Sequence, residues 1–142
     1  MVNGDHEHDG FEIPLDYVDP AGRAVDHRLL GDFVAAAVAG CRSCRDALLT
    51  FVAEDSPTTA RLVELACIST RERLGGLPAT MTEEHAGGPV GLEFRRLAGA
   101  GVDGANSAMF DACARMDSAQ RRAAADTAAG ILITQLRMGL SH

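Results

Sequence analysis

Residues 30–52 have the sequence LGDFVAAAVAGCRSCRDALLTFV, and the apolar side chains of this stretch recur every three or four positions. That spacing places them on one side of an α-helix, whereas a half-buried β-strand would alternate apolar and polar residues. Gly40 interrupts the pattern and indicates either a kink or a boundary between two helices. The apolar stripe comprises Leu30, Phe33, Val34, Ala37, Val38, Cys41, Cys44, Leu48 and Val52.

Signals for further helices follow on the C-terminal side. Ser56-Pro57 is typical of a helix start, with Ser56 as the N-cap, and Gly75-Gly76 is typical of a helix end. Thr80 and Glu83 have the spacing of a capping box, which predicts a short helical turn over residues 81–86.

The remaining C-terminal stretches also favour helices. Residues 89–98 fit a strand or a helix, and we favour a helix because no second convincing strand exists to pair with them. A glycine-rich break at 99–104 precedes another apolar stripe that includes Met109 and Cys113. Asp117 or Ser118 is expected to cap a last helix that runs to Met138. The sequence therefore predicts an all-α fold, a bundle of four or five helices formed by a single domain over residues 24–142.

The N-terminal 23 residues differ from this body. Six acids and no base occur before residue 20, and the near-alternation of apolar residues from Phe11 to Val18 indicates an extended segment. We therefore expect residues 1–23 to be a short, extended, acidic and partly disordered arm. Within it, residues 1–10 should be dispensable, whereas residues 11–18 should pack on the body or on a neighbouring chain.

Charge and hydropathy limit the classes of partner. The chain of 142 residues has a formal net charge of −7, and its 13 basic residues are all Arg. Without a basic block, nucleic-acid binding is not expected, because it relies on concentrated Lys and Arg. No apolar run reaches the roughly 18–20 residues of a membrane span, and the acidic N-terminus does not resemble a signal peptide. These features predict a cytoplasmic protein that does not bind membranes.

The four cysteines are the residues most suggestive of chemistry. Cys41 and Cys44 form a C-x-x-C motif near a helix start, a spacing that suits a zinc site or a redox pair. Cys67 or Cys113 could supply further ligands to a metal. All four cysteines also lie on apolar stripes, and because free Cys is among the most buried residue types, we prefer structural thiols and no cofactor.

The stretch AGCRSCRDALL over residues 39–49 resembles the zinc-binding anti-sigma-factor domain, in which a helix ends in H-x-x-x-C-x-x-C. The resemblance covers about 15–25 residues and implies zinc as the cofactor and a regulatory function. Ala37 occupies the position of the motif histidine, and His27 lies ten residues further upstream.

One other short motif matches a known pattern. Residues 99–104 have the sequence GAGVDG, which fits the G-x-G-x-x-G of dinucleotide-binding turns. The preferred interpretation is a loop between two helices, because residues 118–138 are expected to be helical where a second parallel strand would be needed. No pattern of catalytic residues is recognisable, so enzymatic activity is not expected.

These observations favour a noncatalytic helical protein-interaction or regulatory protein with an unidentified protein partner. We expect a homodimer, because the last helix is apolar over more of its circumference than one buried stripe requires, at Ile131, Leu132, Ile133, Leu136 and Leu140. A central helix surrounded by the others would also be apolar on all sides. The alternatives are a metal- or thiol-dependent regulator that uses Cys41 and Cys44, and a small ligand-binding or catalytic helical bundle.

Overall fold

The computed structural model describes residues 24–86, 88, 90–103 and 106–140, and the predicted arm at 1–23 lies outside these residues. The described residues contain no strand and form seven helices, which confirms the all-α fold but not the expected number of four or five. The helices are α1 (His27–Ala39), α2 (Arg42–Glu54), α3 (Ser56–Leu74), α4 (Ala79–Thr82), α5 (Leu92–Asp103), α6 (Asn106–Arg115) and α7 (Ser118–Leu140).

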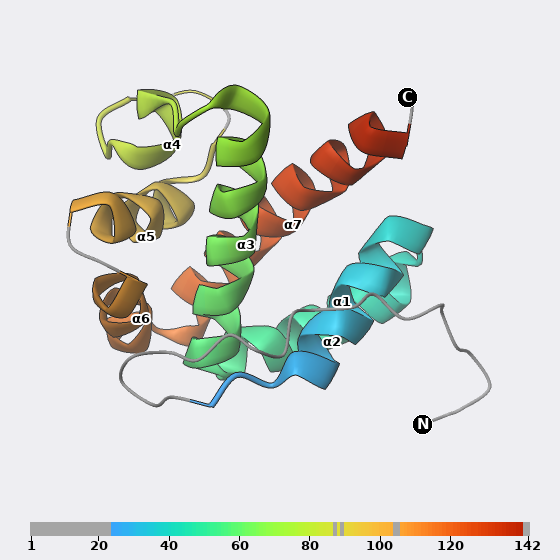
Figure 1. Ribbon diagram of the computed structural model, residues 1–142. Helices are drawn as coiled ribbons and strands as arrows, with labels where there is room; N and C mark the ends of the chain where they lie inside the picture. Colours follow the sequence, from blue (N-terminus) through green and yellow to red (C-terminus); the bar gives the residue numbers. More distant parts are fainter. Residues whose placement is uncertain (1–23, 87, 89, 104–105, 141–142) are drawn as a thin grey trace.

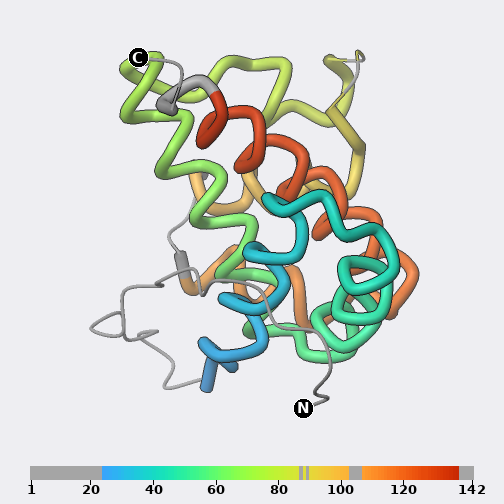
Figure 2. The backbone as a smooth tube through the Cα atoms, turned by 90° about the vertical axis from the view of Figure 1, so that its right-hand side faces the viewer, coloured from blue at the N-terminus to red at the C-terminus, as the bar shows by residue number. Residues whose placement is uncertain are grey.

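The long helix α7 crosses the molecule and packs against α1, α2, α3 and α5 (Figure 1). Helices α4, α5 and α6 lie on the other side of α3 from α1 and α2, and Figure 2 shows from the side how α1 and α2 lie beside α7. These helices cover one face of α7, whereas its opposite face is exposed at Ala123, Asp126, Gly130 and Thr134. The alanine face of α7 is buried within the chain, at Ala124, Ala125, Ala128 and Ala129.

Two glycines end helices in the way that the sequence indicated. Gly40 follows α1 with φ +77°, and Gly75 follows α3 with φ +78°. Both values lie in the left-handed region that residues with a side chain rarely adopt, so the chain turns out of the helix at these points. Gly40 is therefore a boundary between two helices, which is one reason why the chain has more helices than expected.

The helix starts follow the predictions less closely. Ser56 is the first residue of α3, and Asp55 takes the N-cap position instead. The predicted turn over 81–86 is displaced to α4, which follows Pro78 and has no side-chain cap. At α7 the cap is Asp117: its Oδ1 accepts from the Gln120 N–H at 2.8 Å, and Gln120 Oε1 accepts from the Asp117 N–H at 3.0 Å. This reciprocal pair is a capping box.

The predicted break at 99–104 is wrong for residues 99–103, because α5 continues to Asp103. A Cβ atom on Gly99 would lie 2.5 Å from the carbonyl oxygen of Thr82, and one on Gly101 would lie 2.7 Å from Cε of Met109. These glycines therefore permit α5 to approach its neighbours closely rather than ending the helix. A helix over 99–103 also excludes a phosphate-binding turn at these residues.

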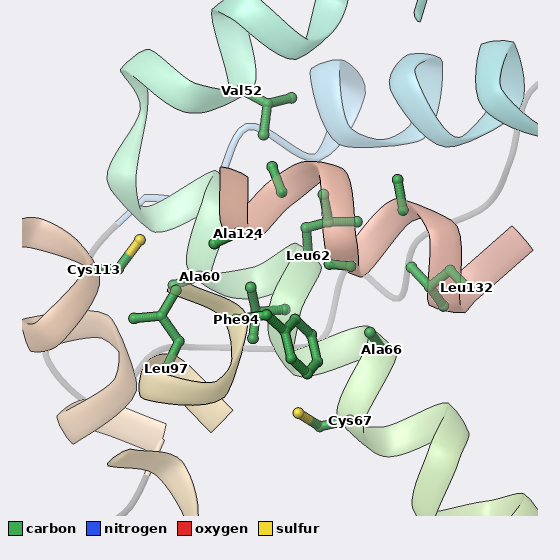
Figure 3. Close-up of a cluster of buried hydrophobic side chains, with 14 of the residues drawn as sticks. Val52, Ala60, Leu62, Ala66, Cys67, Phe94, Leu97, Cys113, Ala124 and Leu132 are labelled. Carbon is green, nitrogen blue, oxygen red and sulfur yellow. The ribbon is translucent and has the colours of Figure 1, made fainter. Parts of the chain in front are cut away.

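The core is formed where α7 meets α3, α5 and α2. Figure 3 shows side chains from these helices in contact around Leu62 and Phe94, with Val52 and Leu132 at the edges of the cluster. Small residues of α7 face this cluster, and the largest buried side chains come from other helices: Phe33 of α1, Phe94 of α5 and Phe110 of α6. None of the described helices is long and apolar enough to cross a membrane.

Candidate functional site

An open groove with a volume of about 580 Å³ lies between the C-terminal half of α3, α4, α7 and the segment that leads into α5. This volume falls in the range of about 300–1,000 Å³ that is common for small-molecule sites. The elements around it occupy the upper part of Figure 1. The lining residues are Thr70, Leu74, Met81, Val90, Asp126, Thr127, Gly130, Ile131, Thr134 and Gln135.

Gly130 lies in the middle of α7 and faces the groove. A Cβ atom on Gly130 would meet no atom within 4 Å, whereas one on Gly91 would lie 2.7 Å from Thr127 Oγ1. Close packing therefore requires a glycine at 91 but not at 130. A glycine inside a helix lowers helix stability by about 1 kcal/mol relative to alanine. The structural effect of Gly130 is to leave space in the groove.

The hydroxyls of Thr70 and Thr134 are engaged as donors, whereas Thr127, which also lines the groove, has a hydroxyl that can donate or accept. Thr70 Oγ1 donates to the Ala66 carbonyl at 2.8 Å, and Thr134 Oγ1 donates to the Gly130 carbonyl at 2.9 Å. Because a hydroxyl has one proton, the lone pairs that remain on both oxygens are acceptors. Each of these two hydroxyls therefore offers acceptor capacity only.

Gln135 adds a further acceptor from α7. Its Oε1 is buried and has no hydrogen-bond partner among the described residues. A buried polar atom without a partner costs free energy, so this carboxamide gains from a donor that enters the groove.

Among the residues that the structure describes, Asp126 is the only charged one that lines the groove. Its carboxylate forms an ion pair with Arg45 in the first turn of α2. Arg45 also pairs with Asp46 at 3.6 Å, so Asp126 shares its counter-ion with a second carboxylate. Apolar surface dominates the rest of the lining, together with three threonine hydroxyls and the carboxamide of Gln135.

The structure separates the four cysteines into two classes. Cys67 and Cys113 are buried, as their stripes predicted, whereas Cys41 and Cys44 are only half-buried at the start of α2. A hydrogen bond with Cys41 raises the pKa of the Cys44 thiol. Burial raises the pKa of Cys67 to about 11 and that of Cys113 to about 12.

The four sulfurs do not meet. Cys113 Sγ donates to the Ser56 carbonyl at 3.4 Å, at the start of α3. Cys67 lies eleven residues further along α3, roughly 16 Å along the helix axis. Cys44 lies at the far end of α2 from Ser56, roughly 15 Å away along that axis. Figure 3 shows Cys67 and Cys113 in different parts of the core.

Cys67 and Cys113 are therefore not placed to complete a metal site with Cys41 and Cys44. Among the residues that the structure describes, no group of three or more His, Cys, Asp or Glu side chains is arranged to hold a metal ion.

A buried ion pair on α3 was not anticipated from the sequence. Arg61 Nη1 lies 2.5 Å from Glu64 Oε1, and the two residues are only 4% and 2% exposed. Their spacing of three residues is a general signal for a helical ion pair, but it does not indicate burial.

The groove was also missed, although Gly130 inside an otherwise strong helix was a signal that could have pointed to it. No family model, curated protein or solved structure matches this chain.

Proposed function

We propose that this chain is a noncatalytic binding protein and that the groove between α3 and α7 is its recognition site. The observation that carries the proposal is Gly130, which leaves the groove open at a helix position where packing would accept a side chain. Glycine at this position makes α7 less stable than alanine would, and the free energy of ligand binding would offset that loss of stability.

The lining supports binding as the activity of this surface. Leu74 is 63% exposed at the groove, and apolar surface of this kind is favourable to cover. The acceptors at Thr134 and Gln135 would orient whatever enters. An apolar surface with a few placed polar groups is the usual composition of a binding site.

The test uses two substitutions at one position and a fluorescent apolar dye, anilinonaphthalene sulfonate. Gly130→Phe fills the groove with a ring, whereas Gly130→Ala adds one methyl group where no atom lies within 4 Å. We expect Gly130→Phe to lower dye fluorescence several-fold and Gly130→Ala to leave it unchanged. Equal fluorescence of the two folded variants would contradict the proposal.

A second candidate is a thiol- or metal-dependent regulator that uses Cys41 and Cys44. The observation that favours it is the contact of these two thiols at the start of a helix of 13 residues, where they are half-buried. The thiolate is the nucleophile in disulfide exchange and the ligand for zinc; the helix N-terminus favours it, whereas the hydrogen bond with Cys41 raises the pKa of Cys44 and opposes it.

Disulfide exchange and zinc content test this candidate. A low-molecular-weight disulfide would oxidise the pair to one disulfide, with loss of two hydrogens, and would itself be reduced to two thiols. Mass spectrometry should detect that product in the wild type and not in Cys41→Ser. One zinc per chain that is lost in Cys41→Ser would support a metal site instead. If the wild type forms no disulfide and contains no zinc, both forms of this candidate are excluded.

A further inference from the structure

We infer that the ligand of the groove is a neutral, largely apolar molecule that donates a hydrogen bond to α7. This inference rests on the proposed function and adds the chemical class of the ligand. It follows from three properties of the lining: its apolar surface, the acceptor oxygens of Thr134 and Gln135, and the pairing of Asp126 with Arg45.

The apolar side chains of the lining indicate that most of the ligand is apolar. Leu74 from α3, Met81 from α4 and Ile131 from α7 line the groove, together with Val90. These side chains come from separate elements, so a ligand between them would be covered on more than one side. Burial of apolar surface on both partners then favours an apolar body.

The hydrogen-bonding groups of α7 indicate that the polar end of the ligand is a donor. Thr134 Oγ1 already donates to Gly130 O, so it can only accept from a ligand. Gln135 Oε1 has no donor among the described residues, and the terminal torsion of a glutamine is broad enough to turn this oxygen. Both residues line the groove, so a donor group within it has two acceptor oxygens to choose from on α7.

The charges at the groove indicate that the ligand is neutral. Asp126 is the one charged residue of the described lining, and Arg45 pairs with it as well as with Asp46. A charged ligand would lose its hydration against apolar side chains without meeting an unpaired opposite charge. A neutral donor such as a hydroxyl avoids that loss.

Four biphenyls of similar size test the class of ligand: 4-phenylphenol, 4-methoxybiphenyl, biphenyl-4-carboxylate and 4-phenylbenzylammonium. Ligand-observed NMR at pH 7 gives the Kd of each, and the phenol is neutral there because phenols titrate near pH 10. We expect the phenol to bind most tightly, with the ether weaker by roughly three- to tenfold because it has no proton to donate. Both ions should bind more weakly than the phenol.

Two variants link the preference to the groove. In the double variant Thr134→Val with Gln135→Leu, the phenol and the ether should bind equally, because the two proposed acceptors on α7 are gone while the shape is kept. Gly130→Phe should abolish binding of all four molecules, whereas Gly130→Ala should not.

The outcomes separate the two proposals. Equal binding of phenol and ether to the wild type, or tightest binding of an ion, would overturn the ligand class while Gly130→Phe still shows the groove to be the site. Unchanged binding of every molecule to Gly130→Phe would overturn the recognition site itself. If none of the four binds but dye binding is still lost in Gly130→Phe, the ligand class is wrong and the groove function stands.

Discussion

Arg45 in the first turn of α2 is paired with Asp126 on α7, 81 positions away in the sequence, at the edge of the groove. Two further contacts join the same helices: Arg122 donates to Thr50 Oγ1 at 2.9 Å, and Arg121 Nε donates to the Ala53 carbonyl at 2.5 Å. The arginines thus hold α2 along α7.

Removal of the Asp126 charge should change ligand preference more than stability. The side chains of Arg45 and Asp126 are 24% and 57% exposed, so Asp126→Asn should cost only about 0–1 kcal/mol. The variant removes a negative charge beside the groove while Arg45 keeps its ion pair with Asp46, so biphenyl-4-carboxylate should meet less repulsion and bind more tightly. Binding constants from NMR check this, with the exposed Glu72→Gln as a control that leaves them unchanged. An unaltered affinity for the carboxylate in Asp126→Asn would count against the described position of this pair.

Two glycine-to-alanine substitutions should have opposite effects on stability. Gly130→Ala should raise the free energy of unfolding by up to about 1 kcal/mol, because it improves helix propensity without a clash. Gly99→Ala should lower it by about 1–3 kcal/mol, because the new Cβ would lie 2.5 Å from the Thr82 carbonyl oxygen. Urea denaturation measures both, and destabilisation by Gly130→Ala would show that position 130 is packed.

Loss of the buried partner of Arg61 should be strongly destabilising. Glu64→Ala leaves Arg61 without this carboxylate at a position that is 4% exposed, and we expect a loss of about 3–5 kcal/mol. Thermal and urea unfolding provide the measurement. The exposed substitution Glu72→Ala, on the same helix, should change stability by less than about 0.5 kcal/mol. Similar losses in the two variants would argue against a buried pair.

The buried thiols predict a loss of stability in alkali. In the unfolded chain a thiol releases its proton near pH 9, whereas burial holds the pKa of Cys67 at about 11 in the folded chain. Between these values the unfolded state gains charge and the folded state does not, so stability falls as pH rises above 9. Each such thiol contributes about 1.4 kcal/mol per pH unit.

Unfolding free energies between pH 8 and pH 11 test this dependence, with pH 8 below the range where the effect begins. Cys67→Ala and Cys113→Ala should each have a shallower slope above pH 9, whatever their stability at neutral pH. A slope that is the same in the wild type and in both variants would show that these thiols are not the cause.

Self-association remains a prediction, and the structure changes the surface to which it applies. The alanine face of α7 is buried within the chain, so it is not available to a second copy. Ile131, Ile133 and Leu136 are only partly buried, and Leu74 is exposed. Light scattering at micromolar concentration should give twice the chain mass of 14.9 kDa. A mass of one chain that stays constant on concentration would refute the dimer.

The sequence by itself determined the helical class and several helix ends, because these depend on interactions between near neighbours. The three- and four-residue apolar spacing indicated helices, Gly40 and Gly75 marked points where the chain must adopt a positive φ, and Asp117 marked the start of α7. Each of these signals acts within a few positions of the chain. They therefore hold whichever helices later pack together.

Only the tertiary structure decided what the same residue types do away from helix ends. At Gly99, inside α5, a side chain would clash with α4, which comes close to the helix there. At Gly130, inside α7, no other element comes close, and the glycine lies beside open space. Cys67 and Cys44 belong to similar apolar stripes, yet only Cys67 lies under neighbouring helices. Burial, the Arg45–Asp126 pair and the groove depend on contacts between residues far apart in the chain, and the local periodicity that specifies a helix contains no information about its neighbours.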